Sequence, residues 1–313
     1  MMVCALIVLV LLLLWLACGA VVAYFGSNRN GNMDKLLGAN EASGDLPEKI
    51  KYLRSQTPGR ISQEFEITNP EGIKLHGYLI PSKKPSNVYV FYSHGYRSPD
   101  GAMEFGCLLP MWQEHDYNFF LVDHRGHGKS GGSHISYGIK ESEDNMHWLN
   151  FLLRQFGEDI QIILHGQSMG AATVLMMSEK DLSPQVKCVI ADCGYTCYFD
   201  EALHALPIPG NRILLEAANT YLSIVHGINM KKAKPLDAVK HAKVPILFTH
   251  GEKDPLVPVA MGKANFDACT SKKEWVVFPD GEHTTAPILH PSEYATCVDT
   301  FIQKYISSPE VCV

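Results

Sequence analysis

Several features that define other classes of protein are absent from this sequence. It has no run of Lys or Arg and its net charge is −6, so a nucleic-acid partner is not expected. It has no heptad array and no internal repeat, which argues against a long coiled coil and a repeat protein. At 313 residues, 46% of them apolar and 19% charged, the chain has the composition of a globular protein. It has room for one large α/β domain or two small ones.

The cysteines form no pattern that indicates disulfides or zinc. There are nine, an odd and scattered set, so a disulfide framework is not expected. A reducing compartment or an anaerobic source fits this usage better. Cys193 and Cys197 are separated by three residues, but no second Cys or His pair stands at zinc spacing. We therefore interpret both as structural and expect no metal.

The N-terminus also lacks charged residues, and here their absence indicates a membrane-spanning segment. Val3 to Phe25 is a run of 23 residues without a charged side chain, and a transmembrane helix needs about 20. A cleaved signal peptide is the alternative, but its apolar core is usually about 7–15 residues long and follows a basic residue. A lipoprotein site at Cys18 fits poorly because Trp15 stands where a small aliphatic residue is expected. The sequence predicts an uncleaved single-pass anchor in the cell membrane over 3–25.

The membrane face of the rest of the chain is weakly determined. Arg29 and Lys35 follow the apolar run and nothing basic precedes it, which favours the cytoplasm by the positive-inside rule. Asp34 and Glu41 partly offset these charges, so the face stays open. The polar, Gly/Asn/Pro-punctuated residues 26–60 are interpreted as a linker with one short helix near 48–54.

After the linker, short apolar runs alternate with helical patterns over a predicted domain at 61–308. The first two runs resemble an antiparallel hairpin, and helices are expected near 102–114, 138–156, 170–180, 259–269 and 291–306. Such alternation predicts an α/β protein with a mostly parallel, eight-stranded sheet covered by helices on both faces. Ligand sites in such sheets lie at the carboxyl ends of the strands. The predicted strands are Phe65–Thr68, Ile73–Ile80, Asn87–Ser93, Phe119–Asp123, Ile160–Leu164, Cys188–Ala191, Ile246–Thr249 and Trp275–Phe278.

One stretch, about 195–237, is too long for a simple connection between neighbouring strands. It is rich in apolar side chains and is interrupted at Pro207-Ile208-Pro209-Gly210. We interpret it as two or three helices that form a lid over the ligand site. The alternative is an extra packing layer without substrate contact.

The candidate chemistry lies where strands end. Ser168 is the centre of Gly166-Gln167-Ser168-Met169-Gly170, a pattern typical of a nucleophilic serine on a tight strand-to-helix turn. A serine hydroxyl needs a histidine to accept its proton and a carboxylate to orient that histidine. Asp254 and His283 each follow a later strand, and the order Ser, Asp, His is that of the α/β-hydrolase triad. Glu252 is the nearest competitor for the carboxylate.

These motifs together resemble the α/β-hydrolase fold, and more narrowly the bacterial membrane-anchored serine aminopeptidase and monoglyceride-lipase-like hydrolases. The resemblance covers about 62–308 and implies the eight-stranded sheet with a helical lid. The same turns place two backbone N–H donors, those of Tyr96 and Met169, as an oxyanion hole. The motifs are Ser93-His94-Gly95-Tyr96, Asp123-His124-Arg125-Gly126-His127-Gly128-Lys129-Ser130, Gly166–Gly170, Gly251-Glu252-Lys253-Asp254 and Gly281-Glu282-His283.

Other polar residues in these motifs have structural interpretations. His94 is expected to shape the oxyanion loop. His124, His127 and His134 lie in a Gly-rich turn without carboxylate or thiolate ligands at a recognised spacing, so we predict no metal there. Gly128-Lys129-Ser130 lacks the earlier glycine of a phosphate-binding loop, because that position is Asp123. No organic cofactor is expected, since the triad supplies nucleophile and base.

The sequence thus predicts a serine hydrolase that cleaves carboxylic ester or related acyl bonds in a small or lipid-like substrate. Ser168 excludes the relatives that use Asp or Cys as nucleophile. An aminopeptidase is the alternative, since Asp200, Glu201 and Glu216 in the lid could hold a substrate ammonium. A non-catalytic binding protein on the same fold is a further alternative. Acyl chain length, leaving group and oligomeric state stay open.

Overall fold

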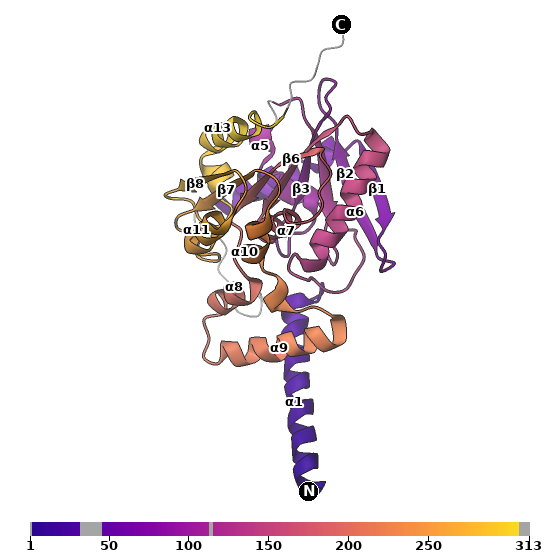
Figure 1. The fold of residues 1–313 in the computed structure, drawn as a ribbon, viewed down its shortest axis with the longest axis vertical. Coiled ribbons are helices and arrows are strands. Elements are labelled where there is room, and N and C mark those ends of the chain that lie inside the picture. Colours follow the sequence, from indigo (N-terminus) through magenta and orange to yellow (C-terminus); the bar gives the residue numbers. More distant parts are fainter. Residues whose placement is uncertain (1, 32–45, 113–114, 307–313) are drawn as a thin grey trace.

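The computed structural model describes residues 2–31, 46–112 and 115–306. One eight-stranded sheet runs through it in the order β1-β2-β4-β3-β5-β6-β7-β8 (Figure 1). β1 and β2 form the predicted antiparallel hairpin, β2 pairs antiparallel with β4, and the remaining pairs are parallel. The predicted α/β fold is therefore confirmed. The strands are β1 Gln63–Thr68, β2 Lys74–Ile80, β3 Val88–Ser93, β4 Asn118–Asp123, β5 Gln161–Gln167, β6 Val186–Asp192, β7 Ile246–Gly251 and β8 Lys273–Phe278.

Helices cover both faces of the sheet, because the central strands are apolar on both sides. Every residue of β3, β4 and β5 is buried. Along β3, Val90 and Tyr92 join one apolar cluster whereas Tyr89 and Phe91 join the other, as the two-residue period of a strand requires. The first cluster includes α4 Gly101–Phe105, α5 Leu109–Trp112 and α13 Pro291–Ile302. The second includes α6 Ile139–Phe156, α7 Met169–Met177 and residues of and beside α11 Val259–Ala268.

The helix predicted over 102–114 is instead two short helices, α4 and α5, and residues 113–114 lie outside the described residues. Gly106 ends α4 where the chain passes close to α3 Leu46–Ser55: a Cβ there would lie 2.3 Å from the Leu53 carbonyl oxygen. Pro110 is the second residue of α5, a position at which its missing N–H is tolerated. A close backbone approach and a proline thus divide the segment.

The segment predicted as a lid is helical. It contains α8 Tyr198–Ala205 and α9 Asn211–His226, followed by η2 Met230–Lys232, α10 Pro235–Ala238 and η3 Val239–His241. α9 buries Leu215, Ala218 and Leu222 in a third apolar cluster, together with Met169 at the start of α7. This cluster also contains Ala23 of the N-terminal helix. The segment predicted as a lid therefore packs on the carboxyl ends of the strands and on the N-terminal helix at the same time.

The N-terminal helix, α1 Met2–Ser27, ends two residues after the predicted anchor, so the predicted linker at 26–60 begins inside it. Among the described residues it is the one helix long and apolar enough to cross a membrane. The residues that follow are held on the domain: Ser27 Oγ donates to the Ile135 carbonyl at 2.8 Å, and Asn28 forms a β-bridge with His134. The first part of this segment is thus fixed by the domain. The rest contains α3 and η1 Pro58–Arg60, while 32–45 lie outside the described residues.

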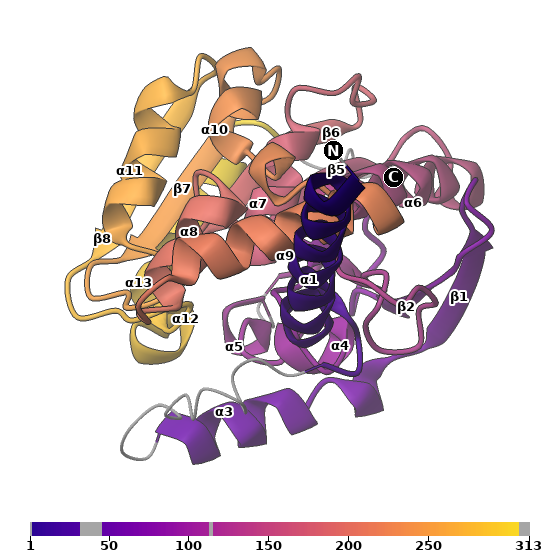
Figure 2. The same ribbon diagram turned by 90° about the horizontal axis from the view of Figure 1, so that it is seen from below.

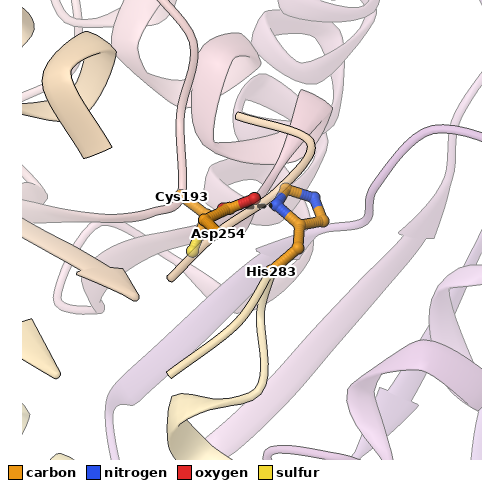
Figure 3. Close-up of side chains that lie close together, drawn as sticks. All are labelled: Cys193, Asp254 and His283. Atoms are coloured by element: carbon orange, nitrogen blue, oxygen red, sulfur yellow. Dashed lines mark hydrogen bonds and ion pairs between the residues drawn. The ribbon is translucent and has the colours of Figure 1, made fainter. Parts of the chain in front are cut away.

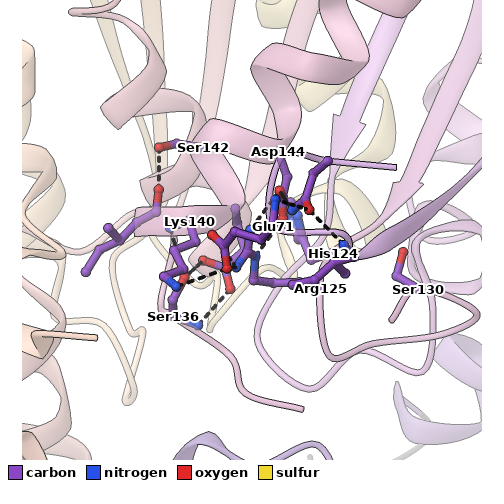
Figure 4. Close-up of polar contacts among 12 residues, drawn as sticks. Glu71, His124, Arg125, Ser130, Ser136, Lys140, Ser142 and Asp144 are labelled. Carbon is purple, nitrogen blue, oxygen red and sulfur yellow. Dashed lines mark hydrogen bonds and ion pairs between the residues drawn. The ribbon is translucent and has the colours of Figure 1, made fainter. Parts of the chain in front are cut away.

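A buried ion pair ties the loop after β4 to α6 and to the β1–β2 turn (Figure 4). The Arg125 guanidinium donates to both carboxylate oxygens of Asp144, at 2.7 and 2.8 Å. Asn69 Nδ2 donates to the same carboxylate at 2.7 Å, and Glu71 accepts from Arg125 at 3.2 Å. The loop so fixed precedes α6 and supports the histidines beneath the candidate site.

We expect Asp144→Ala to destabilise the protein by about 3–5 kcal/mol, because it leaves the buried Arg125 charge without its main partner. Thermal or urea unfolding followed by circular dichroism measures the loss. The matched control is Lys84→Ala, which removes an exposed ion pair with Asp116 and should change stability by less than about 1 kcal/mol. Equal effects of the two substitutions would contradict the role given to the buried pair.

Candidate active site

Ser168 lies on a strained turn between β5 and α7. Its φ of 56° and ψ of −119° are unusual for a residue with a side chain. The two flanking glycines are sterically required: a Cβ on Gly166 would lie 2.2 Å from the Gly170 carbonyl oxygen, and one on Gly170 would lie 1.9 Å from that of Ser93. The turn therefore depends on residues without side chains at both positions. Ser168 consequently stands at the carboxyl edge of the sheet.

The structure brings Ser168, Asp254 and His283 together. The His283 ring nitrogen Nε2 lies 2.8 Å from Ser168 Oγ, and Nδ1 lies 2.7 Å from Asp254 Oδ2. Figure 3 shows the Asp254–His283 contact, made between the loops after β7 and β8. The other carboxylate oxygen of Asp254 accepts from the N–H groups of Leu256 and Val257, both at 2.9 Å. The three side chains thus form one continuous chain of hydrogen bonds.

The competing carboxylate, Glu252, is exposed, whereas the Asp254 side chain is fully buried. A second histidine, His250 at the end of β7, lies on the far side of Asp254, with Nε2 3.4 Å from Oδ2. The same nitrogen donates to the Val257 carbonyl at 2.8 Å. No sequence motif indicated this supporting residue, although it directly precedes Gly251–Asp254.

The charges of this pair stabilise one another. Burial alone would raise the pKa of Asp254, but hydrogen bonds from His250 and His283 outweigh it and hold the pKa well below its usual range. Burial alone would lower the pKa of His283, but the hydrogen bond and the charge of Asp254 outweigh it and raise this pKa. A neighbouring carboxylate that favours the imidazolium is the arrangement that general-base catalysis by histidine requires.

The loop after β3 faces the same turn. Met169 is the first residue of α7, so its N–H is one of those that a helix leaves without an intrahelical partner. Tyr96 lines the same cavity as Ser168 and Met169. Glu104 shapes the loop by accepting from the Gly95 N–H at 2.6 Å and from the Tyr92 hydroxyl at 3.0 Å. Nothing in the sequence pattern indicated Glu104, and the oxyanion role of the two N–H groups stays a prediction.

Three histidines near this loop, His94, His124 and His127, are buried. His94 Nε2 accepts from the His124 N–H at 2.9 Å, and His127 Nε2 accepts from the Arg97 N–H at 3.1 Å. Burial lowers the pKa of His124 and of His127 well below the usual value, so both rings are neutral and serve as hydrogen-bond partners. His134 lies elsewhere, against His226, with ring centroids 3.7 Å apart.

One group of side chains has ligand atoms close enough for a metal. Cys193 Sγ, an Asp254 oxygen and a His283 nitrogen lie within 4.8 Å of one another (Figure 3). However, Asp254 and His283 already bond each other, and burial raises the pKa of the Cys193 thiol well above its ordinary value. A protonated thiol is a poor metal ligand. The group therefore fits a triad with a neighbouring thiol better than a metal centre.

A cavity of about 480 Å³ opens onto Ser168 and His283. This is the size of a pocket for a small organic ligand. Its walls are largely apolar and come mainly from the loops after the strands, α8, α9 and the end of α1, with Met169 of α7 and Met230 of η2. The polar lining residues besides Ser168 and His283 are Tyr96, Tyr137, Tyr195, Tyr198 and Glu201.

The contribution of α1 was not anticipated from the sequence. Val22, Ala23 and Gly26 form part of the cavity wall. The Tyr96 hydroxyl donates to the Gly26 carbonyl at 2.5 Å. The guanidinium of the next residue, Arg97, donates to the carbonyls of Phe25 at 2.7 Å, Asn28 at 3.2 Å and Gly31. The last turn of the predicted anchor is therefore bonded to the loop that carries the predicted oxyanion donor.

The fold and the strand-end arrangement are those of an α/β-hydrolase, and comparisons with known proteins agree. A family model described as "Serine aminopeptidase, S33" matches residues 84–196. The uncharacterized protein YqkD of Bacillus subtilis is 27% identical over 251 residues, which are 79% of this chain and 81% of YqkD. Protein bem46 of Schizosaccharomyces pombe is 25% identical over 267 residues, covering 81% and 82% of the two chains. The esterase Pf2001 of Pyrococcus furiosus has a similar structure, with a TM-score of 0.62 at 21% identity over 86% of this chain and 97% of that one.

The chain therefore has the α/β-hydrolase fold that its motifs predicted, and residues 84–196 are similar to the serine aminopeptidase S33 family. The similarity to the esterase, at this level of identity, is a similarity of fold.

We expect Asp254→Asn to lower the pKa of His283, because the substitution removes the negative charge that outweighs burial. An NMR titration of the His283 ring protons measures the change. The matched control is Asp280→Asn, which removes the carboxylate 2.6 Å from His290 and should leave His283 unchanged. A His283 titration that is identical in the wild type and in Asp254→Asn would contradict the electrostatic coupling.

Proposed function

We propose that the protein is a serine hydrolase that cleaves a carboxylic ester or a related acyl bond through a covalent acyl-enzyme. The observation that carries this proposal is the continuous chain from Ser168 Oγ through His283 to the buried carboxylate of Asp254. In this proposal Ser168 is the nucleophile, His283 the base and Asp254 the orienting carboxylate. The similarity of residues 84–196 to the serine aminopeptidase S33 family supports a hydrolase, and the site supports this chemistry.

The reaction then follows from the geometry. Ser168 Oγ attacks the acyl carbonyl while His283 Nε2 takes its proton, and the backbone N–H groups of Tyr96 and Met169 bind the developing oxyanion. The imidazolium next protonates the departing alcohol, which leaves an acyl-enzyme. Water, deprotonated by His283, attacks this ester and releases the acid and Ser168. His283 accepts a proton only when it is neutral, so turnover requires a pH above its raised pKa.

The cavity walls favour an apolar acyl group. Leu206, Leu215, Leu222 and Val257 line the cavity that contains Ser168, together with four tyrosines. Such walls stabilise apolar surface by about 25 cal/mol for each Å² removed from water. A carboxylesterase- or lipase-like substrate therefore fits the site, and α8 and α9 fit the role of a lid.

We also propose that α1 is an uncleaved membrane anchor. Cleavage of the apolar segment as a signal peptide would remove Val22, Ala23 and Gly26 from the cavity wall. It would also remove the carbonyl that accepts from the Tyr96 hydroxyl. Of the two basic residues that bear on orientation, Lys35 lies outside the described residues. Arg29 follows α1 and donates to the Ser130 carbonyl at 3.0 Å, and by the positive-inside rule it favours the cytoplasmic face.

We expect Ser168→Ala to lower the turnover of a short-chain aryl ester by at least about 10⁴-fold, because the nucleophile is lost. The same substitution should abolish labelling by a fluorophosphonate. The control is Ser292→Ala, which alters an exposed serine of α13 and should change neither result. A wild-type protein that is not labelled would support a non-catalytic binding protein in place of this proposal.

An aminopeptidase is the second candidate, and one observation favours it. Of the three acidic lid residues that could hold a substrate ammonium, Glu201 lines the cavity. Asp200 is exposed, and Glu216 accepts from Lys231 at 2.7 and 2.8 Å. The negative charge of Glu201 also contributes to the raised pKa of His283.

If the substrate carries an ammonium, Glu201→Gln should lower aminoacyl-anilide turnover by about 10- to 100-fold, the value of one charged hydrogen bond. Acyl-ester turnover should change only a few-fold. The two activities are compared on the purified protein, with Glu216→Gln as the matched control. No detectable anilide turnover in the wild type, with ester turnover retained, would exclude the aminopeptidase.

A further inference from the structure

The predicted anchor and the lid are in backbone contact. α1 and α9 cross each other below the sheet in Figure 1, and they overlap in front of the sheet in Figure 2, which is seen from below. At the crossing, a Cβ on Gly19 would lie 2.2 Å from the Ala217 carbonyl oxygen and 3.0 Å from the Tyr221 Cβ. Small residues at such a crossing let two helices approach closely, as they do inside membranes. The lid helix is therefore packed directly on a helix that has the length and composition of a membrane span.

The end of α1 that packs on α9 is fixed to the rest of the domain by hydrogen bonds. Arg97 holds the carbonyls of Phe25, Asn28 and Gly31. Ser27 and Asn28 are bonded to the loop at 134–135. Because the end of α1 is fixed on one side of α9 and Gly19 is pressed onto α9 itself, the position of α1 in a bilayer also sets the position of α9.

The length of α1 decides how deep α9 lies. A helix rises 1.5 Å per residue and the hydrocarbon core is about 30 Å thick, so about 20 residues span it. The predicted anchor over 3–25 is long enough for this, and its last residue, Phe25, lies six residues beyond Gly19. At 1.5 Å per residue, the crossing with α9 therefore lies about 9 Å inside this end of the anchor, within the roughly 5–10 Å depth of an amphipathic helix at the membrane interface.

The surface of the lid has the composition that this depth requires. Outside α1, the described residues include seven large apolar side chains that are exposed, and five of them lie in the lid or at the cavity. On α9, Ile213 is 62% exposed, Ile224 is 68% and Val225 is 53%. Exposed apolar side chains gathered on one element indicate a binding surface. The five residues are Ile208, Ile213, Ile224, Val225 and Leu256.

The cavity reaches this surface. Val22, which lies within the predicted anchor, is part of its wall, and two other lining residues, Ala205 and Leu256, are exposed to the outside. We propose that α9 lies in the membrane interface and that the cavity is filled from the bilayer, so that the substrate is an acyl ester of a membrane lipid. This inference rests on the proposed serine hydrolase and names its substrate class.

The depth of α9 is tested on the full-length chain in dioleoylphosphatidylcholine vesicles. The vesicles contain a phosphatidylcholine with a photoactivatable diazirine on its acyl chain, and mass spectrometry maps the adducts after illumination. We expect adducts on peptides of α1 and α9, and none on α6 or α11, which cover one face of the sheet. Adducts confined to α1 would overturn the proposal, because α9 would then lie outside the acyl-chain region.

The route of the substrate is tested by kinetics with the same vesicles. Ile224→Asp places a charge on the exposed side of α9 without altering a residue that lines the cavity. We expect this variant to hydrolyse a long-chain lipid ester in vesicles at least about tenfold more slowly than the wild type. Its turnover of a water-soluble butyrate ester should stay within about twofold. The matched control is Leu289→Asp, which makes the same kind of apolar-to-charged substitution at an exposed residue of α12 Ala286–Leu289. It should alter neither rate.

Failure of this inference and failure of the proposed function give different results. If the wild type hydrolyses the soluble ester but Ile224→Asp affects both esters equally, the bilayer route is wrong and the serine hydrolase stands. If the wild type hydrolyses neither ester and a fluorophosphonate does not label Ser168, the proposed function is wrong. In that case the inferred substrate class is wrong as well.

Discussion

The close approach of the β5–α7 turn to the end of β3 is the constraint on which the rest of the site depends. Gly170 lies against the Ser93 carbonyl, and Gly166 lies against Gly170, so the backbone can turn within one residue. This turn presents Ser168 at the carboxyl edge of the sheet and begins α7 at Met169. Parallel strands on either side then deliver the other groups to the same edge: the loop of Tyr96 after β3, Asp254 after β7 and His283 after β8. One steric condition thus sets where the chemistry can occur.

The second organising feature is the bonding of α1 to this edge. An apolar helix would ordinarily be considered a tether, yet its last turn accepts hydrogen bonds from Tyr96 and Arg97 and forms a wall of the cavity. Helix α9, in the predicted lid, packs on α1 at Gly19 and shares an apolar cluster with Ala23. The site is therefore built from three parts of the chain that are far apart in sequence. Their contact links the predicted anchor, the predicted lid and Ser168 in one structural unit.

Much of this fold could be predicted because its signals are local. Short runs such as Phe119–Asp123 have the length of a strand and are too short for a helix. The glycine spacing around Ser168 predicts a single tight turn. Asp254 and His283 could be predicted for the same reason, since each lies in the loop that follows a strand. The helix predicted over 102–114 was wrong because its apolar residues suit one helix as well as two. Gly106 ends the first helix through its contact with Leu53, which no pattern within the segment reveals.

The sequence by itself determined the residue types and order of Ser168, Asp254 and His283, the strand pattern and the apolar character of α1. These follow from short-range rules of turn sterics, side-chain periodicity and hydrophobic length. The tertiary structure decided that Asp254 and not Glu252 meets His283, because only the Asp254 side chain points into the buried loop junction. It also decided that Gly19 meets Ala217 and that Arg97 holds the end of α1. Those two contacts join segments about 70 to 200 residues apart, so only packing and hydrogen bonding in the folded chain select them.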